Sequence, residues 1–177
     1  MTQLTKLDKD TIIKYKNLLQ KNDLDAFYKK LSINRDIIQD SFERIGSFLD
    51  ESGVEFEKYL DRIPFYFCCT PKHWINSGQL NIPGKIKKID SCGFVGIQDI
   101  ISLNAEHIEE IGYSILSESS VAALILGDKL KSIDGEAFEE SNLELIQIPE
   151  SLLDKEVYNH LEIALRDVPN CRIKVVK

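Results

Sequence analysis

The amino-acid sequence predicts an α/β solenoid, a fold in which short parallel strands stack one coil after another. Three observations predict it. Apolar residues recur every 22 residues between residues 86 and 152, a pair of apolar residues at alternate positions precedes each recurrence, and residues 1–62 show a different, helical pattern. Because one such unit cannot enclose its own apolar side chains, the units must stack and share a core.

Residues 1–62 are predicted to form a helical region. Asn22 and Asp23 interrupt the first apolar pattern, and Asn34 is placed to cap a later helix. Each predicted helix has one apolar side that needs a cover. We therefore expect this region to cap the N-terminal end of the solenoid. The segments with helical spacing are 10–20, 24–31, 35–49 and 54–60.

Three columns of equivalent apolar residues define the repeat. The residue after the second column is Asp90, Gly112 and Asp134 in turn, so the match extends beyond apolar positions. Aligned columns at one fixed period are the sequence signature of a repeat fold. The columns are Ile86, Ile108, Leu130 and Leu152; Ile89, Ile111 and Ile133; and Phe94, Leu116 and Phe138.

Each repeat begins with a predicted strand. Two apolar residues at alternate positions are typical of a strand that buries one face. Pro83 and Pro149 follow their strands, where a proline ends the strand without removing a needed donor. The apolar residues that come next predict a tight turn and then a short helix or coil. The predicted strand pairs are Leu80/Ile82, Ile101/Leu103, Leu124/Leu126 and Ile146/Ile148.

Residues 80–94 and 121–138 resemble the BspA-type leucine-rich repeat, whose unit has the approximate form L-x-x-I-x-I-P-x-x-V-x-x-I-x-x-x-A-F. The second segment ends in Ala137-Phe138, as the unit does, whereas Ile115-Leu116 departs from it. Ile63 with the following proline resembles a degenerate first copy, so the resemblance covers residues 63–153. It implies a leucine-rich-repeat solenoid whose strands form a parallel sheet along one face. Such proteins usually serve adhesion or protein recognition, and the resemblance implies no active site.

The last residues, 154–177, are predicted to cap the C-terminal end. A helix is expected over 151–166, with Val157 and Leu161 facing the last repeat. Ser151 and Asp154 are placed to form a capping box at its start. A strand over 172–176 is expected to join the edge of the sheet. The chain then divides into a helical region, 1–62, and a solenoid, 63–177.

The charge of the chain argues against direct nucleic-acid binding. The net charge is −7, and residues 63–177 hold 11 Lys and Arg against 17 Asp and Glu. Neutralising phosphates needs an excess of basic residues on one face. The acidic excess favours a protein partner with a basic patch.

The hydropathy pattern predicts a protein without membrane association. No apolar run approaches the roughly 20 residues that a membrane span needs. The first ten residues lack the apolar core of a secretion signal. We therefore expect a cytoplasmic protein, in the producing or the host cell.

The cysteines and one histidine offer a candidate catalytic cluster within residues 68–92. Cys68 and Cys69 lie near His73, and Cys92 follows about one repeat later. A thiol beside a histidine is one interpretation. The alternative is that Cys68 and Cys92 occupy core or turn positions, and it is favoured because free cysteine packs as a small apolar residue. No C-x-x-C pair occurs, so neither a zinc ribbon nor a thioredoxin-like site is indicated. We therefore expect no catalytic residues, no metal and no cofactor.

Outward-facing strand residues form a first candidate surface for a protein partner. They are mostly small and polar, and repeat proteins commonly bind along this sheet face; the alternative is that these side chains are only solvated. The candidates are Asn81, Ser102, Ile125 and Gln147, with Gln79 and Ala123 beside them.

Trp74 precedes the first clear strand and has two interpretations. Exposed, it would be an interface anchor. Buried, it would seal the junction between the helical region and the solenoid. The second is favoured, because large aromatic side chains are seldom left in water.

Glutamates form a second candidate surface, here called the acidic ridge. Regularly spaced carboxylates would imitate the phosphates of a nucleic acid and occupy a basic groove. The alternative is a solvated convex face. The residues are Glu106, Glu109 and Glu110 in one repeat and Glu136, Glu139, Glu140 and Glu144 in the next.

Together these patterns favour a non-enzymatic protein-binding module. A narrower hypothesis is a phage or mobile-element protein that inhibits a host defence machine by occupying its surface. The alternatives are an acidic decoy that mimics nucleic acid and an enzyme that uses the Cys/His cluster. A structural or adhesive role at a cell surface is disfavoured by the missing secretion signal.

Overall fold

The computed structural model describes residues 72–177 throughout, together with residues 60–63, residue 67 and seven residues between 13 and 26. The chain divides into two compact units, Met1–Leu60 and Asp61–Lys177. In the first unit, the described residues within the predicted helix 10–20 are helical, and the Asp23 carboxylate accepts a hydrogen bond (3.3 Å) from the Ala26 N–H. The rest of the helices expected in 1–62, and their capping role, lie outside the described residues.

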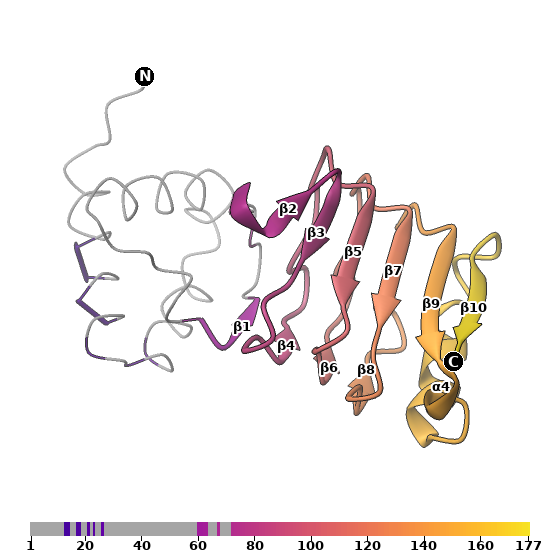
Figure 1. The fold of residues 1–177 in the computed structure, drawn as a ribbon. Coiled ribbons are helices and arrows are strands. Elements are labelled where there is room, and N and C mark those ends of the chain that lie inside the picture. Colours follow the sequence, from indigo (N-terminus) through magenta and orange to yellow (C-terminus); the bar gives the residue numbers. More distant parts are fainter. Residues whose placement is uncertain are drawn as a thin grey trace. The chain divides into compact units, whose positions relative to one another are not determined.

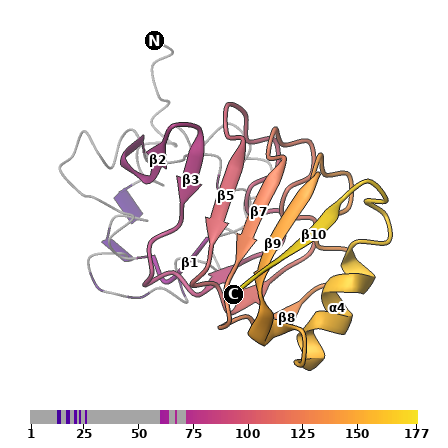
Figure 2. The same cartoon turned by 45° about the vertical axis from the view of Figure 1, so that its right-hand side comes forward.

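The second unit is a solenoid of stacked parallel strands, which Figure 1 shows as a row and Figure 2 shows turned. Its strands form two sheets, a six-stranded sheet in the order β10-β9-β7-β5-β3-β2 and a four-stranded sheet in the order β1-β4-β6-β8. Every neighbouring pair is parallel except β2 with β3. The strands are β1 (Arg62–Ile63), β2 (Ile75–Asn76), β3 (Gln79–Asn81), β4 (Lys88–Ile89), β5 (Ser102–Ala105), β6 (Glu110–Ile111), β7 (Ala123–Leu126), β8 (Ser132–Ile133), β9 (Leu145–Pro149) and β10 (Arg172–Val176).

The predicted apolar columns form the core. Ile89 pairs in register with Ile111, and Ile111 with Ile133, on adjacent strands of the four-stranded sheet. Ile63 pairs with Ile89, which confirms it as the first member of this column. The other two columns are at most 2% exposed. Each apolar residue therefore packs against its counterpart one coil away, and the stack shares one continuous core.

The register of β5 differs from the prediction. Leu103 pairs with Leu80 on one side and with Leu124 on the other. The buried pair of β5 is therefore Leu103 with Ala105, not Ile101 with Leu103. Ile101 is 64% exposed, whereas Ala105 is 1% exposed. The sequence pattern was misleading because a small residue occupies the core position and a large apolar residue lies outside the strand.

Each coil has a turn after its strand in the four-stranded sheet, and one position of this turn has a left-handed backbone conformation in three successive coils. Gly96, Glu118 and Glu140 stand at equivalent positions with φ of 70°, 56° and 55°. Only the first of them is a glycine, the residue that adopts this region without steric cost. The two glutamates therefore hold their turns at a cost in backbone strain.

Replacing Glu118 by glycine is expected to stabilise the protein. Relief of the left-handed strain outweighs the extra entropy of the unfolded chain, with a net gain of about 0.5–1 kcal/mol. The measurement is the free energy of unfolding in a denaturant titration. The matched control is Glu136→Gly in the equivalent turn of the next coil, where φ is not positive and glycine should destabilise. Equal destabilisation by both substitutions would contradict the prediction.

After β9 the chain forms a 3-10 helix, η3 (Glu150–Leu152), a helix, α4 (Glu156–Ala164), and then β10. The predicted strand over 172–176 is confirmed, since β10 pairs in parallel with β9. The predicted capping box is wrong, because α4 begins after Lys155 and has no side-chain cap. Ser151 lies in η3, next to Leu152, which is fully buried as the last member of its column. The last coil therefore continues through Leu152, and the helix starts later.

Helix α4 buries Val157, Leu161 and Ala164 and packs beside β8. This is the apolar side that the sequence predicted. Within the residues that the structure describes, no helix is long and apolar enough to cross a membrane.

Candidate protein-binding surface

The six-stranded sheet presents two rows of outward-facing side chains in continuous register. All members of both rows are partly or fully exposed, whereas the residues between them are buried on β3, β5, β7 and β9. The first row is Gln79, Ser102, Ala123, Leu145 and Arg172. The second row is Asn81, Asn104, Ile125, Gln147 and Lys174. We call these two rows the sheet face.

The predicted outward residues Asn81, Ser102, Ile125 and Gln147 all lie on the sheet face. Ser102, however, belongs to the first row and is aligned with Gln79 and Ala123. The position beside Asn81 and Ile125 is taken by Asn104, which the sequence analysis missed. Its signal was present in the sequence, as a polar residue between Leu103 and Ala105.

Side-chain amides connect neighbouring coils on the sheet face. The Asn104 amide donates to the side-chain oxygen of Asn81 (3.4 Å) and to the Glu106 carboxylate (3.5 Å). The Asn81 amide donates to the backbone carbonyl of Trp74 (3.5 Å). These contacts lie at the long end of hydrogen-bond range. They order polar side chains on a rigid sheet, which lowers the entropy that binding would otherwise cost.

Trp74 does not belong to this surface. It lies in the 3-10 helix η2 (Lys72–Trp74) and is 5% exposed. The centroid of its ring lies 6.2 Å from the ring centroid of Phe67. The ring also packs edge-to-face with His73, at a centroid distance of 6.3 Å. The exposed-anchor interpretation of Trp74 is therefore wrong, because the side chain is part of the core.

The acidic ridge is divided among separate parts of the coil. Glu106 follows β5 and contacts the sheet face, and Glu144 precedes β9. Glu109 and Glu110 lie at β6 on the other sheet. Glu136, Glu139 and Glu140 lie in the turn after β8. The prediction of one ridge is wrong because these residues do not share the 22-residue period, so they occupy different columns.

Lysines neutralise part of this acidic set. Lys131 forms an ion pair with Glu109, and the Lys88 ammonium lies 3.4 Å from the Glu110 carboxylate. The hydrogen bond from Lys131 lowers the pKa of Glu109, and the same contact raises the pKa of Lys131. Alternating charges on adjacent coils therefore reduce the net negative charge of this sheet.

Tyr113 and Glu139 form a hydrogen bond between adjacent turns, with the phenol O–H donating to the carboxylate over 2.7 Å. The carboxylate stabilises the neutral phenol and raises the pKa of Tyr113 to about 12. We expect one tyrosine to ionise near that pH in an absorbance titration, and Tyr113→Phe to remove it. Glu139→Gln should lower this pKa toward the ordinary value of about 10, because the hydrogen bond to Glu139 and its negative charge are the two largest causes of the shift. Identical titrations of the wild type and Glu139→Gln would contradict the contact.

Among the residues that the structure describes, no cysteine and histidine are shown together in one site. Cys68 and Cys69 lie outside the described residues. His73 is exposed, and Cys92 is half-buried in the turn after β4 with φ of 57°. No group of three or more His, Cys, Asp or Glu residues in the described part of the chain is arranged to hold a metal ion.

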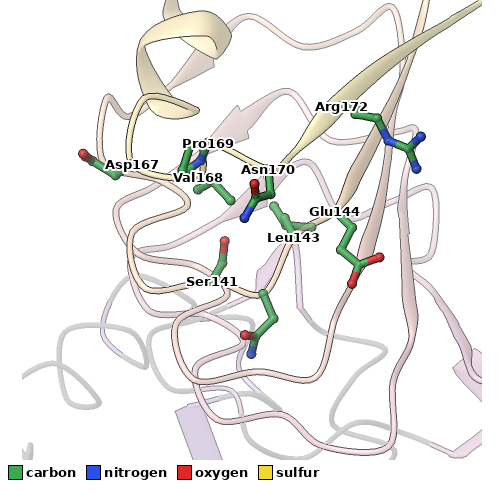
Figure 3. A pocket seen from close by; sticks show the side chains of 9 residues that line it. Ser141, Leu143, Glu144, Asp167, Val168, Pro169, Asn170 and Arg172 are labelled. Atoms are coloured by element: carbon green, nitrogen blue, oxygen red, sulfur yellow. The ribbon is translucent and has the colours of Figure 1, made fainter.

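A cavity of about 410 Å³ lies between the loop that precedes β9 and the connection from α4 to β10. No pattern in the sequence predicted this cavity. Figure 3 shows its polar lining, which contains no histidine or cysteine and so lends no support to thiol chemistry. The Ser141 hydroxyl is buried beside it without a hydrogen-bond partner among the described residues. The lining residues are Ser141, Asn142, Leu143, Glu144, Asp167, Val168, Pro169, Asn170 and Arg172.

Comparison with known proteins agrees with this geometry. A family model described as a BspA-type leucine-rich repeat region matches residues 72–169 in six copies. The match begins at η2 and ends within the connection that follows α4. Neither a curated protein nor a solved structure matched the chain.

Proposed function

The chain belongs to the BspA-type leucine-rich repeat family, and on that premise we propose that it is a protein-binding module that docks its partner on the sheet face. Leucine-rich repeats of this kind suggest protein–protein interaction, and their solenoids are typically non-enzymatic interaction scaffolds. No catalytic residue is needed for such a role, since a rigid array of side chains is sufficient.

One observation supports the sheet face over other surfaces. Its two rows run in continuous register across five adjacent parallel strands, from Gln79 and Asn81 to Arg172 and Lys174. The side chains of the two rows are amides, small residues and isolated apolar or charged groups. Such a mixture can contact a protein without exposing a large apolar patch. The centre, at Ala123 and Ile125, is the least polar part.

Ile101 adds an apolar contact at one margin of the sheet face. It precedes β5, is 64% exposed, and its N–H donates to the Gly78 carbonyl (2.8 Å). A large exposed apolar side chain held by its own backbone is a natural anchor for a partner.

We propose that α4 closes the C-terminal end of the core. The support is the burial of Val157, Leu161 and Ala164 beside β8. An end cover of this kind keeps a solenoid soluble and leaves the sheet face free for binding.

The partner that we propose is a protein with a basic patch. The support is the acidic excess of residues 63–177, of which Glu106 lies beside the sheet face at β5, three strands from the basic end at Arg172 and Lys174. Inhibition of a host machine by this contact is a narrower form of the same proposal.

Site-specific photo-crosslinking tests the proposed function. A photoreactive amino acid is placed at Asn104 or Gln147 on the sheet face, and at His160 on α4 as the control. In extracts of the producing cell or its phage host, we expect one protein to crosslink from both face positions and not from His160. Equal crosslinking from all three positions would overturn the sheet face as the docking surface. A small-molecule product with no crosslinked protein would overturn the binding function.

A further inference from the structure

Strand β10 leaves an unpaired edge on the six-stranded sheet. Among the described strands it pairs only with β9, over the five residues from Arg172 to Val176. The Arg172 N–H donates to the Glu144 carbonyl (2.9 Å) and so points toward the β9 side. Because backbone groups alternate along a strand, the N–H and C=O groups of Ile173 and Val175 point away from β9. Such unpaired groups are a template for another strand.

The side chains of β10 alternate in character as well. Arg172 and Lys174 continue the two rows of the sheet face and are exposed, as is Lys177. Within the described part of the chain, neither Arg172 nor Lys174 has an ion-pair partner. The strand therefore carries unneutralised positive charge on one face, although the chain as a whole is acidic.

The opposite face of β10 is apolar and incompletely covered. Ile173 and Val175 are in register with Ile146 and Ile148, both of which are fully buried. Val175 is nevertheless 45% exposed, because no further described coil covers it. Adding one strand beside β10 would bury this apolar surface and satisfy the outward backbone groups together.

We propose that the edge of β10 is a second docking surface, which binds an extended protein segment with alternating acidic and apolar side chains. The backbone of that segment pairs with Ile173 and Val175. Its acidic side chains lie beside Arg172 and Lys174, and its apolar side chains cover Ile173 and Val175. Opposite charges on adjacent strands stabilise such a pair.

The same charges argue against a second copy of this chain as the occupant. Pairing two β10 strands would bring the Arg172 and Lys174 side chains of both copies onto one face as like-charged neighbours, which is unfavourable. Charged residues on an edge strand thus exclude self-pairing and select a partner of opposite charge.

Synthetic peptides test this inference with the full chain. The probe is a nine-residue peptide of alternating Glu and Val, and the control replaces every Glu by Lys. Binding is measured by fluorescence anisotropy, and amide exchange of Ile173 and Val175 is followed by NMR. We expect the Glu peptide to bind at least tenfold more tightly than the Lys peptide and to slow exchange at both amides.

Two variants separate backbone pairing from charge. Val175→Pro removes an outward N–H and leaves the bonds to β9, so Glu-peptide affinity should fall at least tenfold, whereas Val175→Thr should retain it. Lys174→Glu should weaken Glu-peptide binding and strengthen Lys-peptide binding. This second variant keeps the test decisive if Val175→Pro fails to fold.

Three outcomes would overturn the proposal. One is equal binding by Val175→Pro and Val175→Thr. Another is concentration-dependent dimerisation that Val175→Pro abolishes, which would make a second copy the occupant. The third is displacement of the peptide by a short oligonucleotide with unchanged amide exchange, which would show attraction by charge alone. Ile125→Arg on the sheet face should leave peptide binding intact, so failure here is distinguishable from failure of the proposed function.

Discussion

Gly127→Ala should strongly destabilise the solenoid. Gly127 follows β7, and a Cβ atom added there would lie 2.0 Å from the backbone carbonyl oxygen of Glu106 on the previous coil. The obstacle is backbone, so it cannot move aside as the end of a flexible side chain would. We expect a loss of about 3 kcal/mol, at the upper end of penalties for overpacking. The measurement is the free energy of unfolding by denaturant titration, supported by the melting temperature.

The matched control is Gly135→Ala. There the nearest atom to the added Cβ is Ile163 Cγ2 at 3.5 Å, an ordinary van der Waals contact, and φ is not in the left-handed region. This variant should be nearly as stable as the wild type. Equal stability of the two alanine variants would show that the coils of β5 and β7 are not as close at Gly127 as the structure has them.

Ile125→Arg should abolish partner binding without unfolding the protein. Ile125 lies in the second row of the sheet face, between Asn104 and Gln147 on the flanking strands. An arginine there adds bulk and charge at the least polar part of the proposed docking surface. Residues at the centre of an interface carry most of its affinity, so a loss of at least about thirtyfold is expected. Affinity for the crosslinked partner, once identified, is the measurement.

Ile163→Arg is the control for that substitution. Ile163 is 40% exposed on α4, away from the sheet face, and the chemical change is the same. Binding by this variant should match the wild type, and both variants should keep the wild-type melting temperature. If Ile125→Arg binds normally, the partner uses another surface.

The sequence predicted the apolar columns because a buried position tolerates few side chains. Ile89, Ile111 and Ile133 face the same neighbours one coil apart, so the same residue type recurs at the same spacing. The shared core therefore leaves a clear periodic signal.

The register of β5 was not predictable from hydrophobicity alone. Ala105 is buried yet small, and Ile101 is large yet exposed. Counting apolar residues therefore placed the strand two residues too early. Strand pairing, which fixes the register, depends on the coils on either side, and this error hid Asn104 from the candidate site.

Charge patterning predicted the surface poorly for a related reason. Exposed glutamates are under no packing constraint, so Glu109 and Glu136 carry no information about each other's position in the coil. Their neutralisation by lysines depends on contacts between coils 22 residues apart, such as Lys131 with Glu109. Ion pairs of this kind become apparent only when the sequences of successive repeats are aligned.

Because the backbone groups of successive coils match, the solenoid can lose or gain one whole coil and still pair its strands. Residues 113–134 span one period, and removing them would join Gly112 to Gly135, the residue that follows Asp134 in the next coil. The apolar columns would close again with one member fewer, and the sheet face would lose the strand that carries Ala123 and Ile125. The span available to a partner thus changes in steps of one strand, about 4.8 Å.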